Sequence, residues 1–301
     1  MSFCPVSLSP NIIADLQNIS CYEFMRNAFE TGTIIAIIAG VTGYFVVLRR
    51  SAFVAHAFSE IGFAGASGAI LLGIPPIAGL VLGSVIGGLA ISALGRRAAN
   101  RDTQIGIVLA FALGLGLLFI SLYKAFATAA ISILFGEILG ISSSEVLLTL
   151  VGGVCILVAM GFLYRPLLFA SLDEEVAEAK GLPMLFLGTA FLMVVAVAVS
   201  FAVQVTGVLL IFSLMVTPAA TAQYLSRRPS WAIVLSVGIA LMATWVGLFM
   251  AFYTPYPVSF FITGIVFGLY LIVRIIRLVT KPHVVNTQTP PVLPKSPGHS
   301  P

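Results

Sequence analysis

Charged side chains are scarce in this sequence. Asp, Glu, Lys and Arg make up 9% of its 301 residues, whereas 59% of the residues are hydrophobic. Because soluble domains are about one quarter charged, this composition excludes a soluble domain and indicates an integral membrane protein. The net charge of +4 comes from basic residues that stand in pairs at the ends of apolar runs. Such pairs are typical of membrane topology signals, not of a nucleic-acid-binding surface.

Several motifs of common chemistry are also absent from the sequence. It has no GxxxxGK[ST] phosphate loop, no HExxH and no CxxC, so it carries no visible site of its own for ATP or for hydrolysis. Cys4, Cys21 and Cys155 lack metal-type spacing and read as plain thiols, with a Cys4–Cys21 disulfide as a minor alternative. No cleavable signal peptide is evident in residues 1–20.

Long apolar runs recur from one end of the chain to the other. They predict an all-α integral membrane protein with about nine transmembrane helices. The runs are 24–48, 52–72, 77–94, 105–123, 146–163, 184–203, 205–225, 231–253 and 258–276. Residues 124–145, which include LFGEILGIS, are too polar for a full span and predict an interfacial or partly inserted segment.

The basic residues predict the orientation of these runs. With nine spans, nearly all of the basic span ends fall on one side, which the positive-inside rule assigns to the cytoplasm. The chain then divides into an extracytoplasmic segment (1–23), a transmembrane domain (24–278) and a Pro-rich, disordered cytoplasmic tail (279–301). The N-terminus is expected outside and the C-terminus inside.

The second run carries two ionisable residues, His56 and Glu60. Four residues apart on a helix, they share one face. Each costs roughly 3 kcal/mol to bury near the bilayer centre, and both are good ligands for transition metals. The pair is either a way-station for an ion or two satisfied polar side chains. Because two ligands are too few for a structural metal site, the ion hypothesis is a low-affinity relay.

Two other functions can be tested on the same run. An ion-gradient-driven carrier could use Glu60 as its proton site, but such carriers often have inverted repeats, and we find no convincing internal repeat. The GASG run at 65–68 resembles the serine motif of rhomboid proteases. His56 lies roughly 16 Å from Ser67 along the same helix, and the other histidines, His283 and His299, are in the tail. Close packing of small residues therefore explains the motif better than proteolysis.

A charged stretch, 171–183, predicts a short capped helix between two spans. Asp173 is a candidate N-cap with Glu174 and Glu175 in the first turn, Ala177 can line an apolar face, and Gly181 ends the helix. The helix is either a soluble connector or a docking site for a cytoplasmic partner.

The seventh run contains Pro218, which removes a helical hydrogen bond. Ser213, Thr217 and Thr221 are four residues apart around that break. Their hydroxyls either bond back to their own helix, which is slightly favoured, or line a translocation path.

Four stretches in order (48–73, 134–142, 171–183 and 205–228) resemble the permease subunits of ABC importers for zinc, manganese or iron(II), the ABC-3 family. The resemblance implies a fold like that of the vitamin B12 permease, the type II ABC importer fold, in a prokaryotic cytoplasmic membrane. It implies a homodimer that works with a separate cytoplasmic ATPase and an extracytoplasmic metal-binding protein, so the chain itself is not an enzyme. The metal ion is then cargo, and no permanently bound cofactor is expected.

The resemblance also assigns roles to residues. By this likeness, residues 171–181, with Asp173, Glu174, Glu175, Ala177 and Gly181, form the coupling helix that meets the ATPase. Family members often place an acidic residue first and His four positions later, whereas here His56 precedes Glu60. Both positions keep a ligand-capable side chain, so a transient metal site is retained, but its metal is open among zinc, manganese and iron(II).

Overall fold

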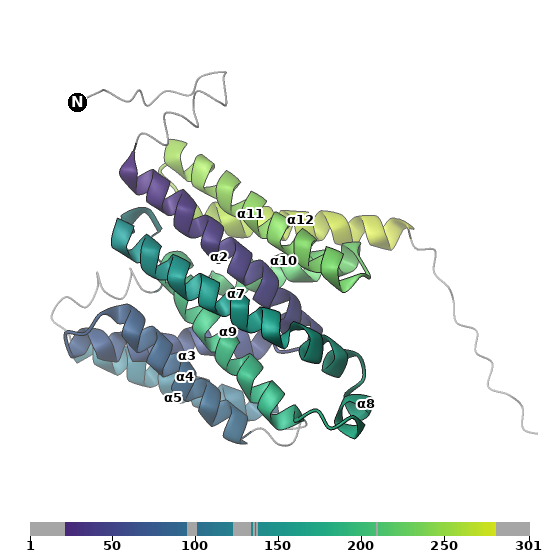
Figure 1. Ribbon diagram of the computed structural model, residues 1–301. Coiled ribbons are helices and arrows are strands. Elements are labelled where there is room, and N and C mark those ends of the chain that lie inside the picture. The colour runs from purple at the N-terminus through teal and green to yellow at the C-terminus, as the bar shows by residue number, and fades with distance from the viewer. Residues whose placement is uncertain are drawn as a thin grey trace, which may run out of the picture.

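The computed structural model describes residues 22–94, 101–122, 134, 136, 138–208 and 210–280, and this part of the chain is helical and contains no strand (Figure 1). The expectations for residues 1–21 and 281–301 lie outside it. The elements are α2 (Glu23–Leu48), α3 (Ala52–Leu71), α4 (Pro76–Leu94), α5 (Arg101–Leu122), η2 (Ile138–Gly140), α7 (Ser143–Leu172), α8 (Glu174–Ala179), α9 (Met184–Thr206), α10 (Ile211–Leu225), α11 (Pro229–Tyr253) and α12 (Val258–Thr280).

Eight of these helices are long and apolar enough to cross a membrane. They correspond to eight of the nine predicted runs. The seventh run, 205–225, is wrong in its start, because α10 begins only at Ile211 and has 15 residues. Gly207 adopts a φ of +80° directly after α9, a conformation that a helix does not continue through. The apolar run is therefore divided between the end of α9 and a short α10.

Helix α7 is longer than predicted. The run was expected to end near residue 163, yet α7 continues through Pro166 to Leu172 and has 30 residues. A proline inside a helix removes one backbone donor and bends the helix without always ending it. The extension carries the chain directly to α8, which follows after the single residue Asp173.

The helices form two groups joined by α9, and α7 packs against α9 and α2. Helices α3, α4 and α5 pack together on one side, and α2, α10, α11 and α12 on the other (Figure 1). Helix α9 packs against α4 and α3 of the first group and against α2 of the second. Large side chains that lie fully inside this core include Phe45, Phe58, Phe63 and Phe191.

Small residues bring α3 and α4 into close contact. A Cβ atom on Gly65 would collide with the carbonyl oxygen of Gly79, so only glycine fits there. Ser67 is buried, and its hydroxyl donates to the Phe63 carbonyl oxygen at 2.7 Å. These contacts confirm close packing as the role of the GASG run. The GxxxG step at Gly264 and Gly268 differs, since a Cβ added at either position would meet no atom of the described chain within 4 Å.

Candidate functional site

Side-chain contacts show which helix ends lie together at each end of the bundle. We call the end that carries α8 the α8 end; there the Tyr164 hydroxyl, in the second half of α7, lies 3.5 Å from the Ser230 hydroxyl at the start of α11. We call the opposite end, where α2 begins, the Asn27 end; there Gln204 near the end of α9 donates a hydrogen bond to Glu145 at the start of α7 at 3.3 Å. Successive long helices therefore run antiparallel between the two ends.

The predicted pair on α3 is an interaction within one helix. His56 Nε2 lies 3.3 Å from Glu60 Oε1, and the two side chains are 34% and 16% exposed. The His56 ring also meets the ring of Phe212 on α10 edge-on, with centroids 5.6 Å apart. His56 Nδ1 is buried and has no hydrogen-bond partner among the described residues. Neutral imidazole can offer such a nitrogen to a ligand, so the pair is only partly satisfied by its own chain.

The donor set at this place is small. No group of three or more His, Cys, Asp or Glu side chains that could hold a metal ion occurs among the described residues. His56 and Glu60 supply one nitrogen and one carboxylate, which suit a first-row divalent ion. Because such ions take at least four ligands, water or a second molecule must supply the others.

The polar residues predicted on α10 separate into two groups. Ser213 and Thr217 are half-buried, and Phe212, next to Ser213 in the chain, is 38% exposed. Pro218 and Thr221 point into the bundle, and the Thr221 hydroxyl donates to the Thr217 carbonyl oxygen at 2.7 Å. Only Ser213 and Thr217 therefore lie on the open face of α10, while Thr221 bonds back to its own helix.

Helix α8 is capped as the sequence predicts. Asp173 Oδ1 accepts a hydrogen bond from the Val176 backbone nitrogen at 3.0 Å, and Glu174 and Glu175 are exposed in the first turn. Gly181 has a φ of +81°. The Leu182 nitrogen donates to the Ala177 carbonyl oxygen at 3.2 Å, which is a Schellman ending that favours glycine at that position.

The apolar face of α8 is turned toward its own chain. Ala177 is fully buried in the core that α7 and α9 share, and Lys180 lies over the Phe169 ring of α7 at 5.2 Å. Ala177, expected to line the apolar face of the coupling helix, is fully buried and lies on the inner side of α8. It anchors α8 on α7, and Glu174, Glu175 and Val176 form the exposed side.

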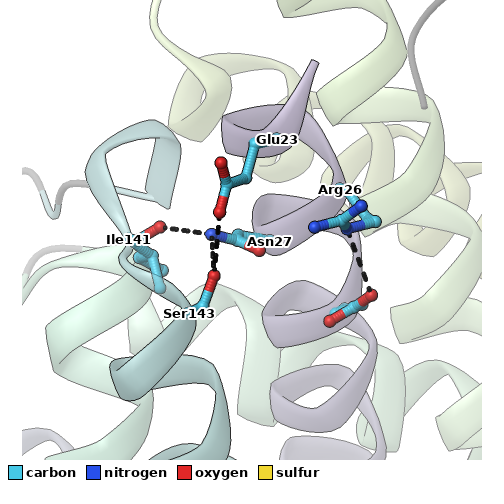
Figure 2. Close-up of polar contacts among 6 residues, drawn as sticks. Glu23, Arg26, Asn27, Ile141 and Ser143 are labelled. Atoms are coloured by element: carbon cyan, nitrogen blue, oxygen red, sulfur yellow. Dashed lines mark hydrogen bonds and ion pairs between the residues drawn. The ribbon is translucent and has the colours of Figure 1, made fainter. Parts of the chain in front are cut away.

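A polar network closes the Asn27 end (Figure 2). Asn27 is 4% exposed and donates to the Ile141 carbonyl oxygen at 3.0 Å and to the Ser143 hydroxyl at 3.3 Å. The Ser143 hydroxyl in turn donates to Glu23 at 3.1 Å. Asn27 was not among the predicted functional residues, although an amide within an apolar run is a signal that could have identified it.

Two further features lie beside this network. Ser142 and Glu145 form a capping box at the start of α7, with the Ser142 nitrogen 2.9 Å from Glu145 Oε2. Ile138 of η2 is 7% exposed. It lines a small space with Thr206, Leu210, Leu214, Val258, Ser259 and Ile262. Of the segment 124–145, expected not to cross the membrane, residues 124–133, 135 and 137 lie outside the described part of the chain, and Ile138–Gly140 form a short 3-10 turn packed against α2 and α9.

Comparisons with known proteins agree with this arrangement. The model of the ABC 3 transport family matches residues 21–277. An uncharacterized membrane protein of Cyanophora paradoxa is 33% identical over 258 residues, which cover 84% of this chain and 86% of that protein. A manganese transport system membrane protein of Listeria monocytogenes is 28% identical over 238 residues, 79% of this chain and 85% of that protein.

The fold also matches a solved structure. A chain of PsaBC from Streptococcus pneumoniae, solved in complex with Fab, is 27% identical and has a TM-score of 0.80. The match covers 89% of this chain and 100% of that one. It confirms the expected all-helical membrane fold.

Proposed function

Because the chain belongs to the ABC 3 transport family, we propose that it is the channel-forming subunit of an ATP-driven importer for a divalent first-row metal ion. Manganese is the first candidate, since a relative 28% identical to this chain bears the name of a manganese transport system. The observation that carries the proposal is the His56–Glu60 pair, 3.3 Å apart and partly exposed on a membrane-spanning helix.

The position of the pair supports transport over a structural role. Glu60 lies nine residues into α3, roughly 13 Å along the helix. An ionisable group at that depth does not face lipid without a large free-energy penalty, so its open side meets water or protein. Two copies of this chain, joined across the open faces of α3 and α10, would bring together two imidazoles and two carboxylates. A homodimer therefore supplies the ligands that one chain lacks.

The two ends receive different partners in this proposal. The exposed carboxylates of Glu174 and Glu175 on α8 offer a short docking surface to a separate cytoplasmic ATPase. The α8 end then faces the cytoplasm, in keeping with the positive-inside rule, and the Asn27 end faces outward, where a metal-binding protein delivers the ion. Conformational change driven by ATP passes from α8 to α7 through the buried Ala177.

Uptake of radioactive manganese, zinc and iron(II) by cells lacking this chain tests the proposal. We expect the uptake of at least one ion to fall about tenfold or more and to return when the full chain is restored. Unchanged uptake of every first-row divalent ion would contradict the proposal. Uptake that persists after removal of the ATPase partner would favour instead a carrier that uses Glu60 as a proton site.

A further inference from the structure

A cavity opens at the α8 end, away from the His56–Glu60 pair. An open cavity of about 310 Å³ is lined by Val47 of α2 and by Ala220, Gln223 and Tyr224 of α10. At about 30 Å³ for each water molecule, this volume has room for on the order of ten waters. Its lining includes an amide and a phenol but no charged side chain.

The amide of Gln223 has a fixed orientation. Its Nε2 donates to the Tyr44 backbone carbonyl oxygen at 3.1 Å. Because a carbonyl can only accept a hydrogen bond, the nitrogen of the amide must face α2. Oε1 is the other polar atom of this half-buried side chain, which lines the cavity.

One face of α10 links the cavity to the pair. Phe212, Val216 and Ala220 are four residues apart and share that face, and each is exposed or half-buried. Phe212 touches the His56 ring, and Ala220 lines the cavity. Eight residues separate the two, roughly 12 Å along the helix. The distance between the pair and the cavity is thus about two helical turns along a partly open surface.

We propose that the cavity is a release chamber, in which Gln223 Oε1 and water receive the divalent cation when it leaves His56 and Glu60. The inference rests on the proposed transport function and adds a residue to it. Carboxylate, carbonyl and water oxygens suit manganese. A neutral amide binds a cation more weakly than a carboxylate does, and an ion path needs sites weak enough for the ion to leave.

Two substitutions of similar size test the role of the amide. Gln223→Glu puts a carboxylate in the chamber and should trap the ion, so we expect manganese uptake by whole cells to fall about tenfold. Elemental analysis of the purified full chain should then find more bound manganese than in the wild type. Gln223→Met removes the oxygen ligand. Uptake should fall several-fold, and the purified chain should hold no more manganese than the wild type.

Gln204→Met is the matched control. It also deletes one amide hydrogen bond between helices, but at the Asn27 end. We expect similar small losses in Tm for both Met variants and slower uptake only for Gln223→Met. Wild-type uptake and metal content in both Gln223 variants would overturn the release chamber, as would equal slowing by Gln204→Met. If the wild-type chain itself supports no metal uptake, the proposed function fails with it.

Discussion

The Asn27 end and the α8 end of the bundle are built differently. At the Asn27 end, side-chain hydrogen bonds join α2 to residues 141–143 and α7 to α9, and Ile138 fills the space among the helix ends. At the α8 end, a cavity of about 310 Å³ opens beside α10. The comparison indicates that one end is fastened and the other is accessible, as in a transporter whose path opens toward the α8 side.

The difference follows from the side chains at each end. A buried amide such as Asn27 ties neighbouring segments together because losing its partners would leave polar atoms unsatisfied. The α8 end has its own polar contacts, such as the hydrogen bond from Gln223 to α2 and the 2.6 Å contact between the Ser92 and Thr189 hydroxyls, but an open cavity lies beside them. Opening the Asn27 end therefore requires breaking its polar contacts, whereas the α8 end already has an open cavity beside α10.

The largest expected effect comes from removing the His56–Glu60 pair, which lies between the two ends. His56→Ala combined with Glu60→Ala should lower metal uptake by about 100-fold or more, since even outer-shell substitutions at metal sites cost about 10–100-fold. The complex should still assemble, which copurification with the ATPase measures. Ser67→Ala on the same helix is the control and should transport normally. Normal uptake by the double variant would make the pair structural.

The next effect concerns the docking surface at the α8 end. Reversing Glu174 and Glu175 to Lys should reduce ATP-dependent uptake about tenfold, because complementary charge sets both the rate and the specificity of docking. ATP hydrolysis by the reconstituted complex should lose its stimulation by metal. Substitution of both residues by Gln should have a smaller effect. If ATP hydrolysis stays equally coupled to metal uptake in all variants, α8 is only a connector between α7 and α9.

Whether the sequence could predict a contact depends on how far apart its two residues lie along the chain. The cap at Asp173, the end of α8 at Gly181 and the shared face of His56 and Glu60 follow from rules that span a few residues, and the structure has them in place. Gln223 bonds to a residue 179 positions away and Asn27 to one 114 positions away. Spacing along the chain does not reveal such partners, because they depend on how helices pack.

The same reason explains the errors within single elements. Hydrophobicity alone does not locate the start of α10, because the apolar run continues across Gly207, whose backbone conformation ends α9. The span 146–163 was expected to end before Pro166, yet α7, which packs against α2 and α9, continues through this proline to Leu172.

A smaller effect should come from loosening the fastened end. Asn27→Ala leaves the Ile141 carbonyl oxygen without its side-chain donor and should lower the free energy of unfolding by about 1–3 kcal/mol. For a chain of this size, Tm should fall by roughly 2–4 °C per kcal/mol. Glu30→Gln is the control, because the exposed Arg26–Glu30 pair, 3.9 Å apart, contributes at most about 1 kcal/mol. Equal Tm values for the two variants would contradict the fastened end.

The smallest effect concerns strain at the α8 end, in the turn between α2 and α3. Arg50 has a φ of +53°. The Ser51 nitrogen donates to the Val46 carbonyl oxygen at 2.8 Å and the Arg50 nitrogen to that of Val47 at 3.1 Å. This is a Schellman ending with arginine in the position that favours glycine. Arg50→Gly should therefore stabilise the chain by about 1 kcal/mol, and Arg50→Ala should not, since it removes the charge and keeps the strain. A higher Tm with slower uptake in Arg50→Gly would mean that the exposed arginine side chain is needed for transport. An unchanged or lower Tm would show that the backbone at Arg50 is not strained.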